Sequence, residues 1–361
     1  MITPTPRLFL YALFLCSGGT ALVYELVWTR SLVLVFGGTS YAVTTVLASF
    51  MGGLGLGGYL CGRVSGGLSR PGRVYGVLEL LIGGYALCVP FLLGLAEPLY
   101  RWVYPHVLDH PGWLTLVRVG VTGVVLVIPT TLMGATLPLL VRYVHVGGMP
   151  FGRSVGTLYG INTLGAVLGV SLAGFVLLPR LGLSGTTYLA ACVNGLVGLL
   201  ALWRLGGPAP QAASSTAAPP AEAAAALPSD SGWALSAGTR RWVLAAFAVS
   251  GASAMVYEVA WTRALVMSLG SSTYSFTCIL SAFILGLALG SLILGRLVDG
   301  LRHPLAVLGW LELLVGLSAV VLVPLYGLVP LWVKGLVTQY GGSYGTLLTL
   351  EFLLIIGLTL V

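Results

Sequence analysis

The stretch Ser17-Gly-Gly-Thr-Ala-Leu-Val-Tyr-Glu-Leu-Val-Trp-Thr-Arg30 occurs a second time, as Ser250-Gly-Ala-Ser-Ala-Met-Val-Tyr-Glu-Val-Ala-Trp-Thr-Arg263. The two copies are 233 residues apart, from Ser17 to Ser250, and the same offset relates Gly62-Arg63 to Gly295-Arg296 and Glu79-Leu80 to Glu312-Leu313. Chance does not keep register over such a distance. The chain therefore holds two copies of one unit, arranged head to tail.

The composition places both copies in a membrane. Of 361 residues, 57% are hydrophobic and only 7% are charged, whereas about 25% of an ordinary soluble domain is charged. So little charge cannot cover a surface that faces water, so the apolar side chains must face lipid. The basic residues stand singly at the ends of apolar runs, which argues against a nucleic-acid partner. The five cysteines lie inside apolar runs without metal-ligand spacing, so we expect no disulfide, no metal and no cofactor.

Apolar runs of about 20 residues, the length that crosses a bilayer, predict an all-α polytopic protein with ten helices. The first copy has six, near 8–29, 40–62, 74–96, 113–143, 155–178 and 182–203, and the second has four, near 242–264, 273–295, 306–328 and 345–361. We expect a first six-helix repeat over 1–205, an Ala/Pro/Ser-rich cytoplasmic linker over 206–240, and a second repeat over 241–361 that is truncated in helix ten.

Arginine sets the predicted orientation. The N-terminus and the loops after the even-numbered spans carry Arg7, Arg63, Arg70, Arg73, Arg142, Arg153, Arg204, Arg240 and Arg241, while the opposite side has mainly Arg101 and Arg180. By the positive-inside rule, the N-terminus is cytoplasmic. Six spans per copy is an even number, so both copies enter the membrane in the same direction. That is the tandem parallel-repeat plan of the major facilitator superfamily (MFS), in which a central cavity lies between the halves.

Several motifs resemble those in the membrane half of bacterial fused MFS/spermidine synthase proteins. They are residues 21–30, the Gly-rich second span ending at Gly62-Arg63, and residues 129–138, 156–169 and 173–179. The resemblance implies a location in the bacterial inner membrane, a connection with polyamines, and a soluble aminopropyltransferase-like domain as partner. These residues contain no catalytic motif and no Gly-rich nucleoside loop, so the sequence leaves open whether the protein is an enzyme.

Charged residues inside a bilayer are costly and need a reason. In facilitator-type folds spans one, four, seven and ten line the cavity, and here these spans carry Glu25, Arg118, Glu258 and Glu351. Such carboxylates either bind a cation, a polyamine or a proton, or are neutralised by a neighbouring helix and hold the bundle together. Arg118 alternatively reaches the outer headgroups, and Asn162 alternatively bonds to a neighbouring helix. The candidate substrate-binding residues are Glu25, Glu258, Arg118, Glu351, Tyr24, Tyr257 and Asn162.

A second group of polar residues lies near the cytoplasmic ends of the spans. Glu79 and Glu312 are close in sequence to Arg73 and Arg302, which favours gating or anchoring salt bridges. The loops that follow Arg63 and Arg296 resemble the facilitator loop that latches the two halves, although both arginines are equally explained as surface anchors. The candidate gating residues are Arg63, Arg296, Asp299, Glu79 and Glu312.

Three functions fit these observations. The first is a transporter module for a polyamine or another small cationic solute, or for a proton. The second is a membrane anchor or substrate-delivery domain for a spermidine synthase-like aminopropyltransferase. The third is a structural subunit whose apolar faces pack against lipid and other membrane proteins.

Overall fold

The computed structural model describes residues 4–38, 40–107, 109–146, 149–207, 236–270 and 272–359. Almost all of them are helical, and the described residues contain no strand. The helices are α1 (Pro4–Phe36), α2 (Ser40–Val64), η1 (Ser65–Gly67), α3 (Pro71–Val107), α4 (Pro111–Val146), α5 (Phe151–Leu172), η2 (Ala173–Leu177, a π-helical turn), α6 (Leu178–Leu205), α7 (Ala237–Leu269), α8 (Thr273–Leu297), η4 (Val298–Gly300), α9 (Pro304–Tyr340) and α10 (Tyr344–Thr359). Each of the ten predicted apolar runs overlaps one of the helices α1 to α10 along most of its length.

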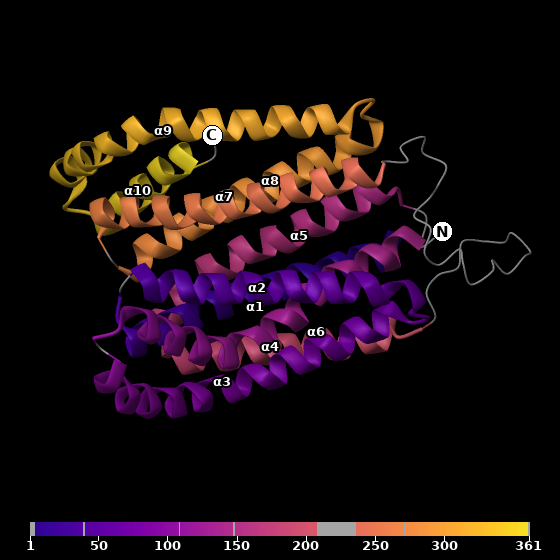
Figure 1. Ribbon diagram of the computed structural model, residues 1–361, viewed down its shortest axis with the longest axis horizontal. Helices are drawn as coiled ribbons and strands as arrows, with labels where there is room; N and C mark the ends of the chain where they lie inside the picture. Colours follow the sequence, from indigo (N-terminus) through magenta and orange to yellow (C-terminus); the bar gives the residue numbers. More distant parts are fainter. Residues whose placement is uncertain are drawn as a thin grey trace, which may run out of the picture. The chain divides into compact units, whose positions relative to one another are not determined.

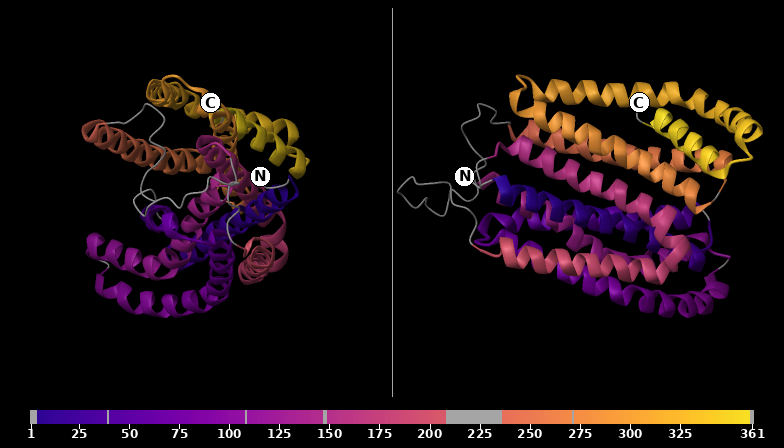
Figure 2. Two further views of the ribbon diagram at one scale, coloured as in Figure 1. Left: turned by 90° about the vertical axis from the view of Figure 1, so that its right-hand side faces the viewer. Right: turned by 180° about the vertical axis from the view of Figure 1, so that it is seen from behind.

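Eight helical stretches in the described part of the chain are long and apolar enough to cross a membrane, so this is a multi-pass membrane protein. One of these stretches, Phe151–Leu205, is 55 residues long, and as one straight helix it would span about 80 Å, far more than the roughly 30 Å hydrocarbon layer. It is divided at Gly182, whose φ of 67° breaks the helical conformation. The chain reverses there, so α5 and α6 run in opposite directions (Figure 2).

Several helix ends differ from the predicted spans. Helices α3 and α9 have 37 residues each, and both continue past the predicted ends near 96 and 328 because a helix does not have to stop at the edge of the hydrocarbon. Helix α7 begins at Ala237, inside the segment predicted as linker, because the side chain of Ser236 caps it by accepting a hydrogen bond from the Thr239 amide at 3.1 Å. The rest of that predicted linker, residues 208–235, lies outside the described residues.

The chain forms two compact units. Unit 1 consists of Met1–Ser214 together with Leu287–Asp299, so it holds α1 to α6 and the last part of α8. Unit 2 consists of Ser215–Gly286 and Gly300–Val361, so it holds α7, the first part of α8, α9 and α10.

In unit 1 the helices pair as α1 with α5, α2 with α4, and α3 with α6 (Figure 1). Glycines let the backbones of the first two pairs touch. A Cβ atom added at Gly57 of α2 would collide with the carbonyl group of Thr131 on α4, and one added at Gly165 of α5 would collide with that of Leu15 on α1. Contacts of this kind replace the hydrophobic effect as the force that holds helices together in lipid.

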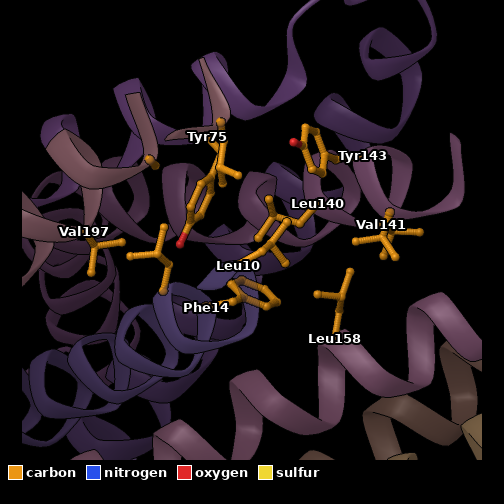
Figure 3. Packing of buried hydrophobic residues seen from close by; sticks show 12 residues of the cluster. Leu10, Phe14, Tyr75, Leu140, Val141, Tyr143, Leu158 and Val197 are labelled. Atoms are coloured by element: carbon orange, nitrogen blue, oxygen red, sulfur yellow. The ribbon is translucent and has the colours of Figure 1, made fainter. Parts of the chain in front are cut away.

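A cluster of buried side chains joins five of the six helices of unit 1. Phe14 of α1 meets Tyr75 of α3 edge to face, with ring centroids 6.2 Å apart. Leu140 of α4, Leu158 of α5 and Val197 of α6 close the cluster around them, and all five side chains are nearly or fully buried (Figure 3). This core fixes the relative positions of α1, α3 and α6, which carry the polar side chains described next.

Candidate functional site

A fully buried carboxyl group lies between α1, α3 and α6 of unit 1. Glu79 of α3 is 0% exposed. Its Oε1 accepts a hydrogen bond from Ser17 Oγ on α1 at 2.5 Å, and its Oε2 accepts one from Asn194 Nδ2 on α6 at 2.5 Å. The hydroxyl of Tyr24 on α1 donates in turn to Asn194 Oδ1 at 2.8 Å. We call Ser17, Tyr24, Glu79 and Asn194 the polar network.

The polar network does not contain the partner predicted for Glu79. The sequence places Arg73 close by, and a salt bridge was the expected interaction, but within the described residues both carboxyl oxygens of Glu79 bond to neutral donors. The reason is the direction of the side chain, since the face of α3 that carries Glu79 packs against α1 and α6 rather than toward the loop.

Two members of the polar network were missed from the sequence. Ser17 is the first residue of the repeated motif, and it precedes Glu79 by 62 residues, just as Ser250 precedes Glu312 by 62. That equal spacing is a signal that could have linked them. Asn194 is a lone amide in the sixth apolar run, which by itself indicates a polar contact in the membrane.

The polar network adjoins a small hollow. The ring of Tyr24 stacks on that of Trp28, with centroids 4.8 Å apart and an interplanar angle of 16°. Trp28 lines a hollow of about 240 Å³ between α1, α3 and α6, whose other lining residues include Ser31, Leu93 and Thr187. The Trp28 Nε1–H is buried and donates to no acceptor within the described residues.

Unit 2 repeats part of this arrangement. Ser250 Oγ of α7 donates to Glu312 Oε1 of α9 at 2.7 Å, as Ser17 does to Glu79. The ring of Tyr257, the counterpart of Tyr24, lies parallel to that of Trp261 at 6.0 Å. Tyr326 of α9 also stacks on Trp261, with ring centroids 4.4 Å apart and an interplanar angle of 1°. Tyr326 occupies the position in unit 2 that corresponds to Leu93 in unit 1, so an aliphatic side chain is replaced by an aromatic one.

The two glutamates of the repeated motif are both buried. Glu25 is 6% exposed and Glu258 is 7% exposed. Oε2 of Glu258 is buried and has no hydrogen-bond partner within the residues that the structure describes. Trp261 follows Glu258 by three residues, so the two side chains lie on neighbouring parts of one helix face.

The remaining predicted substrate-binding residues lie apart from the polar network. Arg118 is buried, with Nε donating to the Tyr100 hydroxyl and Nη2 to the Phe36 carbonyl, both at 3.2 Å. It therefore bonds to groups of α3 and α1. A Cβ atom added at Gly18 of α1 would collide with Asn162 of α5. Asn162 therefore lies at the contact between these two helices. Glu351 is half-buried in α10.

The structure gives Asp299 a definite contact. Its Oδ1 accepts from the amide of Gly152 at 3.0 Å and its Oδ2 from the amide of Arg153 at 2.8 Å. These amides begin α5, whose N-cap is Pro150 and whose own side chains supply no cap. Asp299 therefore caps α5 from a segment 146 and 147 residues away in sequence. A carboxylate is well placed there, because the N-terminus of a helix carries partial positive charge.

Glycines let α5 and α8 pack closely against each other. A Cβ atom added at Gly156 of α5 would collide with Gly295 of α8, and one added at Gly160 would meet Leu292. The two predicted gating arginines are less constrained. The guanidinium group of Arg63 lies 4.5 Å from the centroid of the Tyr59 ring, and Arg296 is exposed.

We expect Asp299→Ala to loosen the first turn of α5. Loss of a helix cap costs about 1 kcal/mol, which corresponds to roughly fivefold faster amide exchange if opening is local. Hydrogen–deuterium exchange of the peptide that contains Gly152 and Arg153 measures this. Asp299→Asn should exchange at a rate between those of the wild type and Asp299→Ala, because its amide oxygen can accept one of the two bonds while its NH2 group cannot accept the other. Unchanged exchange in Asp299→Ala would show that the cap contributes nothing.

A segment of 196 residues, 53% of the chain, is 28% identical to a polyamine aminopropyltransferase of Corynebacterium efficiens. The match covers 34% of that protein, so the chain spans about a third of the length of the curated relative it matches. No protein-family model matches the chain, and no solved structure matches it. The chain is thus distantly similar, over about half of its length, to part of a polyamine aminopropyltransferase.

Proposed function

We propose that this protein is an MFS-like membrane transporter module for a small cationic solute, with a polyamine as the first candidate. One observation carries the proposal. The repeat places Glu25 and Glu258 at equivalent positions in two apolar helices; both are buried, and one oxygen of Glu258 has no hydrogen-bond partner within the described residues. A carboxylate kept inside a membrane without full pairing is typical of a site for a cation or a proton.

The aromatic side chains beside Glu258 support a cationic ligand. Tyr257, Trp261 and Tyr326 form a parallel stack in unit 2. Aromatic faces attract ammonium groups by about 0.5–2 kcal/mol, and the attraction grows as water is excluded. A carboxylate on the helix that carries Tyr257 and Trp261 therefore offers an organic ammonium both a charge and an outer π face of the stack.

The pairing of helices in unit 1 supports the MFS-like plan. In facilitator folds each six-helix half contains two inverted three-helix repeats, so helices one, two and three correspond to four, five and six. Under this correspondence the α1 and α5 pair maps onto the α4 and α2 pair, and the α3 and α6 pair maps onto itself. These are the three principal pairs of unit 1. An inner-membrane location with a cytoplasmic N-terminus, as the arginines predict, completes the proposal.

Uptake of radiolabelled spermidine, with a panel of smaller organic cations, into proteoliposomes tests the proposal. We expect the wild type to accumulate at least one of these cations, and Glu258→Gln and Glu25→Gln to lower uptake by at least tenfold. The amide keeps the size of the side chain but removes the charge that attracts the ammonium group.

Asp109→Asn is the matched control, because it neutralises an exposed carboxylate outside the predicted spans. It should transport like the wild type. If the protein is folded and no cation moves, or if the two glutamine variants match the wild type, the transporter proposal is wrong.

The similarity to a polyamine aminopropyltransferase favours a second candidate, a membrane anchor or substrate-delivery domain for such an enzyme. This candidate predicts that aminopropyl transfer to putrescine occurs in membranes that contain the protein while no cation accumulates in proteoliposomes. Transport without aminopropyl transfer would exclude it.

A further inference from the structure

A buried arginine lies beside the last residue of α1, where α3 and α4 of unit 1 pass. Arg118 of α4 is 6% exposed and Tyr100 of α3 is 5% exposed. Arg118 Nε donates to the Tyr100 hydroxyl, and Nη2 donates to the carbonyl oxygen of Phe36, both at 3.2 Å. The rings of Tyr100 and Phe36 also meet edge to face, with centroids 4.9 Å apart. These contacts hold the guanidinium group in a fixed position.

The positive charge of Arg118 is only partly balanced. Both of its acceptors are neutral groups, and the carbonyls at the C-terminal end of a helix such as α1 together carry about half a negative charge. Within the described part of unit 1 no carboxylate pairs with Arg118, and Glu97, one turn before Tyr100, pairs with Arg101 instead. Arginine stays charged in proteins, and a buried charge without a full counter-charge is strongly unfavourable. An anion at this position would therefore be stabilising.

Two hydrogen-bond donors are available for such an anion. Nη1 of Arg118 has no acceptor among the described residues, and it is not one of their fully enclosed polar atoms, so a ligand can reach it. The Tyr100 oxygen accepts from Arg118 Nε, which leaves the hydroxyl hydrogen to donate, and the described residues offer it no acceptor. Because the two side chains touch, both donors can bond to oxygens of the same anion.

Exposed tryptophans place this pair near the surface of the membrane. Trp102 of α3 is 70% exposed and Trp113 of α4 is 63% exposed, and tryptophan is enriched at the level of the lipid headgroups. Trp102 follows Tyr100 by two residues and Trp113 precedes Arg118 by five, which is about 3 Å and 8 Å along the helix axes. Phosphate is the anion that lipid headgroups supply at this level, and the planar guanidinium group matches its geometry.

The second copy does not repeat this arrangement. The offset of 233 residues takes Tyr100 to Val333 and Arg118 to Glu351. Valine has no hydroxyl group, and glutamate has the opposite charge. The pair of donors is thus a feature of the first copy alone, unlike the serine–glutamate hydrogen bond that both copies share.

We propose that Arg118 and Tyr100 form a binding site for a phosphate group, either that of an anionic phospholipid or free phosphate. The phosphate oxygens accept hydrogen bonds from Nη1 of Arg118 and from the Tyr100 hydroxyl, and they supply the negative charge that the Phe36 carbonyl lacks. The site does not depend on the proposed transport function, because its ligand is an anion and its residues are not the membrane carboxylates.

Native mass spectrometry of the purified, delipidated protein tests the proposal. The probes are dioleoylphosphatidylglycerol, dioleoylglycerol, which has the same acyl chains without phosphate, and inorganic phosphate. We expect the first phospholipid to bind at least tenfold more tightly than dioleoylglycerol. Arg118→Gln should weaken this binding at least tenfold and Tyr100→Phe at least threefold, because the first removes a charged donor and the second a neutral one. Inorganic phosphate that binds with the same dependence on both residues, without a preference for the phospholipid, would assign the site to free phosphate.

Arg101→Gln is the matched control, because it removes the same charge from an exposed position next to Tyr100. It should bind the phospholipid like the wild type. Circular dichroism checks that each variant is folded. Should Arg118→Gln fail to fold without its bond to Phe36, Tyr100→Phe decides the outcome, because it keeps the ring that packs on Phe36. Wild-type affinity for both phosphate probes in the folded variants would overturn the proposal, as would equal binding of the two lipids together with no binding of inorganic phosphate.

Discussion

Gly57→Leu is expected to separate α2 from α4 and to destabilise the protein by about 3 kcal/mol or more, near the upper end of the range for overpacked sites. Gly57 is buried, and its would-be Cβ collides with backbone atoms of Thr131 and approaches the amide nitrogen of Ala135 at 3.0 Å. Backbone atoms cannot rotate out of the way as a side chain does. Accommodating leucine therefore requires the two helices to move apart, which breaks contacts along their whole length.

The midpoint of unfolding by SDS in mixed micelles measures this effect. Gly52→Leu is the matched control, because Gly52 is on the same helix, is exposed, and has nothing within 4 Å of its would-be Cβ. It should be neutral or stabilising by up to about 1 kcal/mol, since leucine favours the helix more than glycine does. Equal losses from the two variants would show that the α2–α4 contact is not what limits stability.

Breaking the polar network is expected to cost about 2–4 kcal/mol. Glu79→Ala leaves the Ser17 hydroxyl and the Asn194 amide as buried donors without an acceptor, and each such group costs about 1–3 kcal/mol. Asn194→Leu should cost a similar amount, because it strands one oxygen of Glu79 and the hydroxyl of Tyr24.

A double-mutant cycle separates this coupling from packing. The Glu79→Ala/Asn194→Leu variant should be less unstable than the sum of the single variants by about 1–3 kcal/mol. Glu97→Ala provides the control, because Glu97 forms an exposed ion pair with Arg101 at 2.6 Å, and such pairs contribute about 0–1 kcal/mol. Simple additivity of the two single variants would mean that Glu79 and Asn194 are neighbours without energetic coupling.

The helices could be predicted because each has an apolar run of the length that a bilayer requires. The register between the copies was also predictable, and it correctly identified Glu79 and Glu312 as equivalent. The partners of these glutamates were not predictable. The hydrogen bond from Asn194 to Glu79 joins residues 115 apart, and it depends on how α6 turns back at Gly182 and which of its faces meets α3. Sequence neighbours such as Arg73 are a poor guide when a side chain points between helices.

Of the residues described at the candidate site, the sequence indicated the membrane carboxylates and the motif tyrosines Tyr24 and Tyr257. Glu25 and Glu258 were recognisable because charge inside an apolar run is rare. The contacts of Asp299 could not be predicted from the sequence, because an acidic residue in a polar loop is common and does not indicate a particular partner. The signal lay instead at α5, which begins after Pro150 without a serine, threonine, aspartate or asparagine to cap it. A missing local cap leaves the first amides to water or to a distant residue, and at α5 Asp299 supplies the acceptors.

The cap that Asp299 places on α5 has a consequence for the order of events during synthesis. Helix α5 leaves the ribosome and enters the membrane well before Asp299 is made, because 146 residues separate Asp299 from Arg153. At an elongation rate of about 5–20 residues per second, the first turn of α5 remains uncapped for roughly 7–30 seconds. The end of the first repeat that holds this turn is therefore completed only after part of the second repeat has been made.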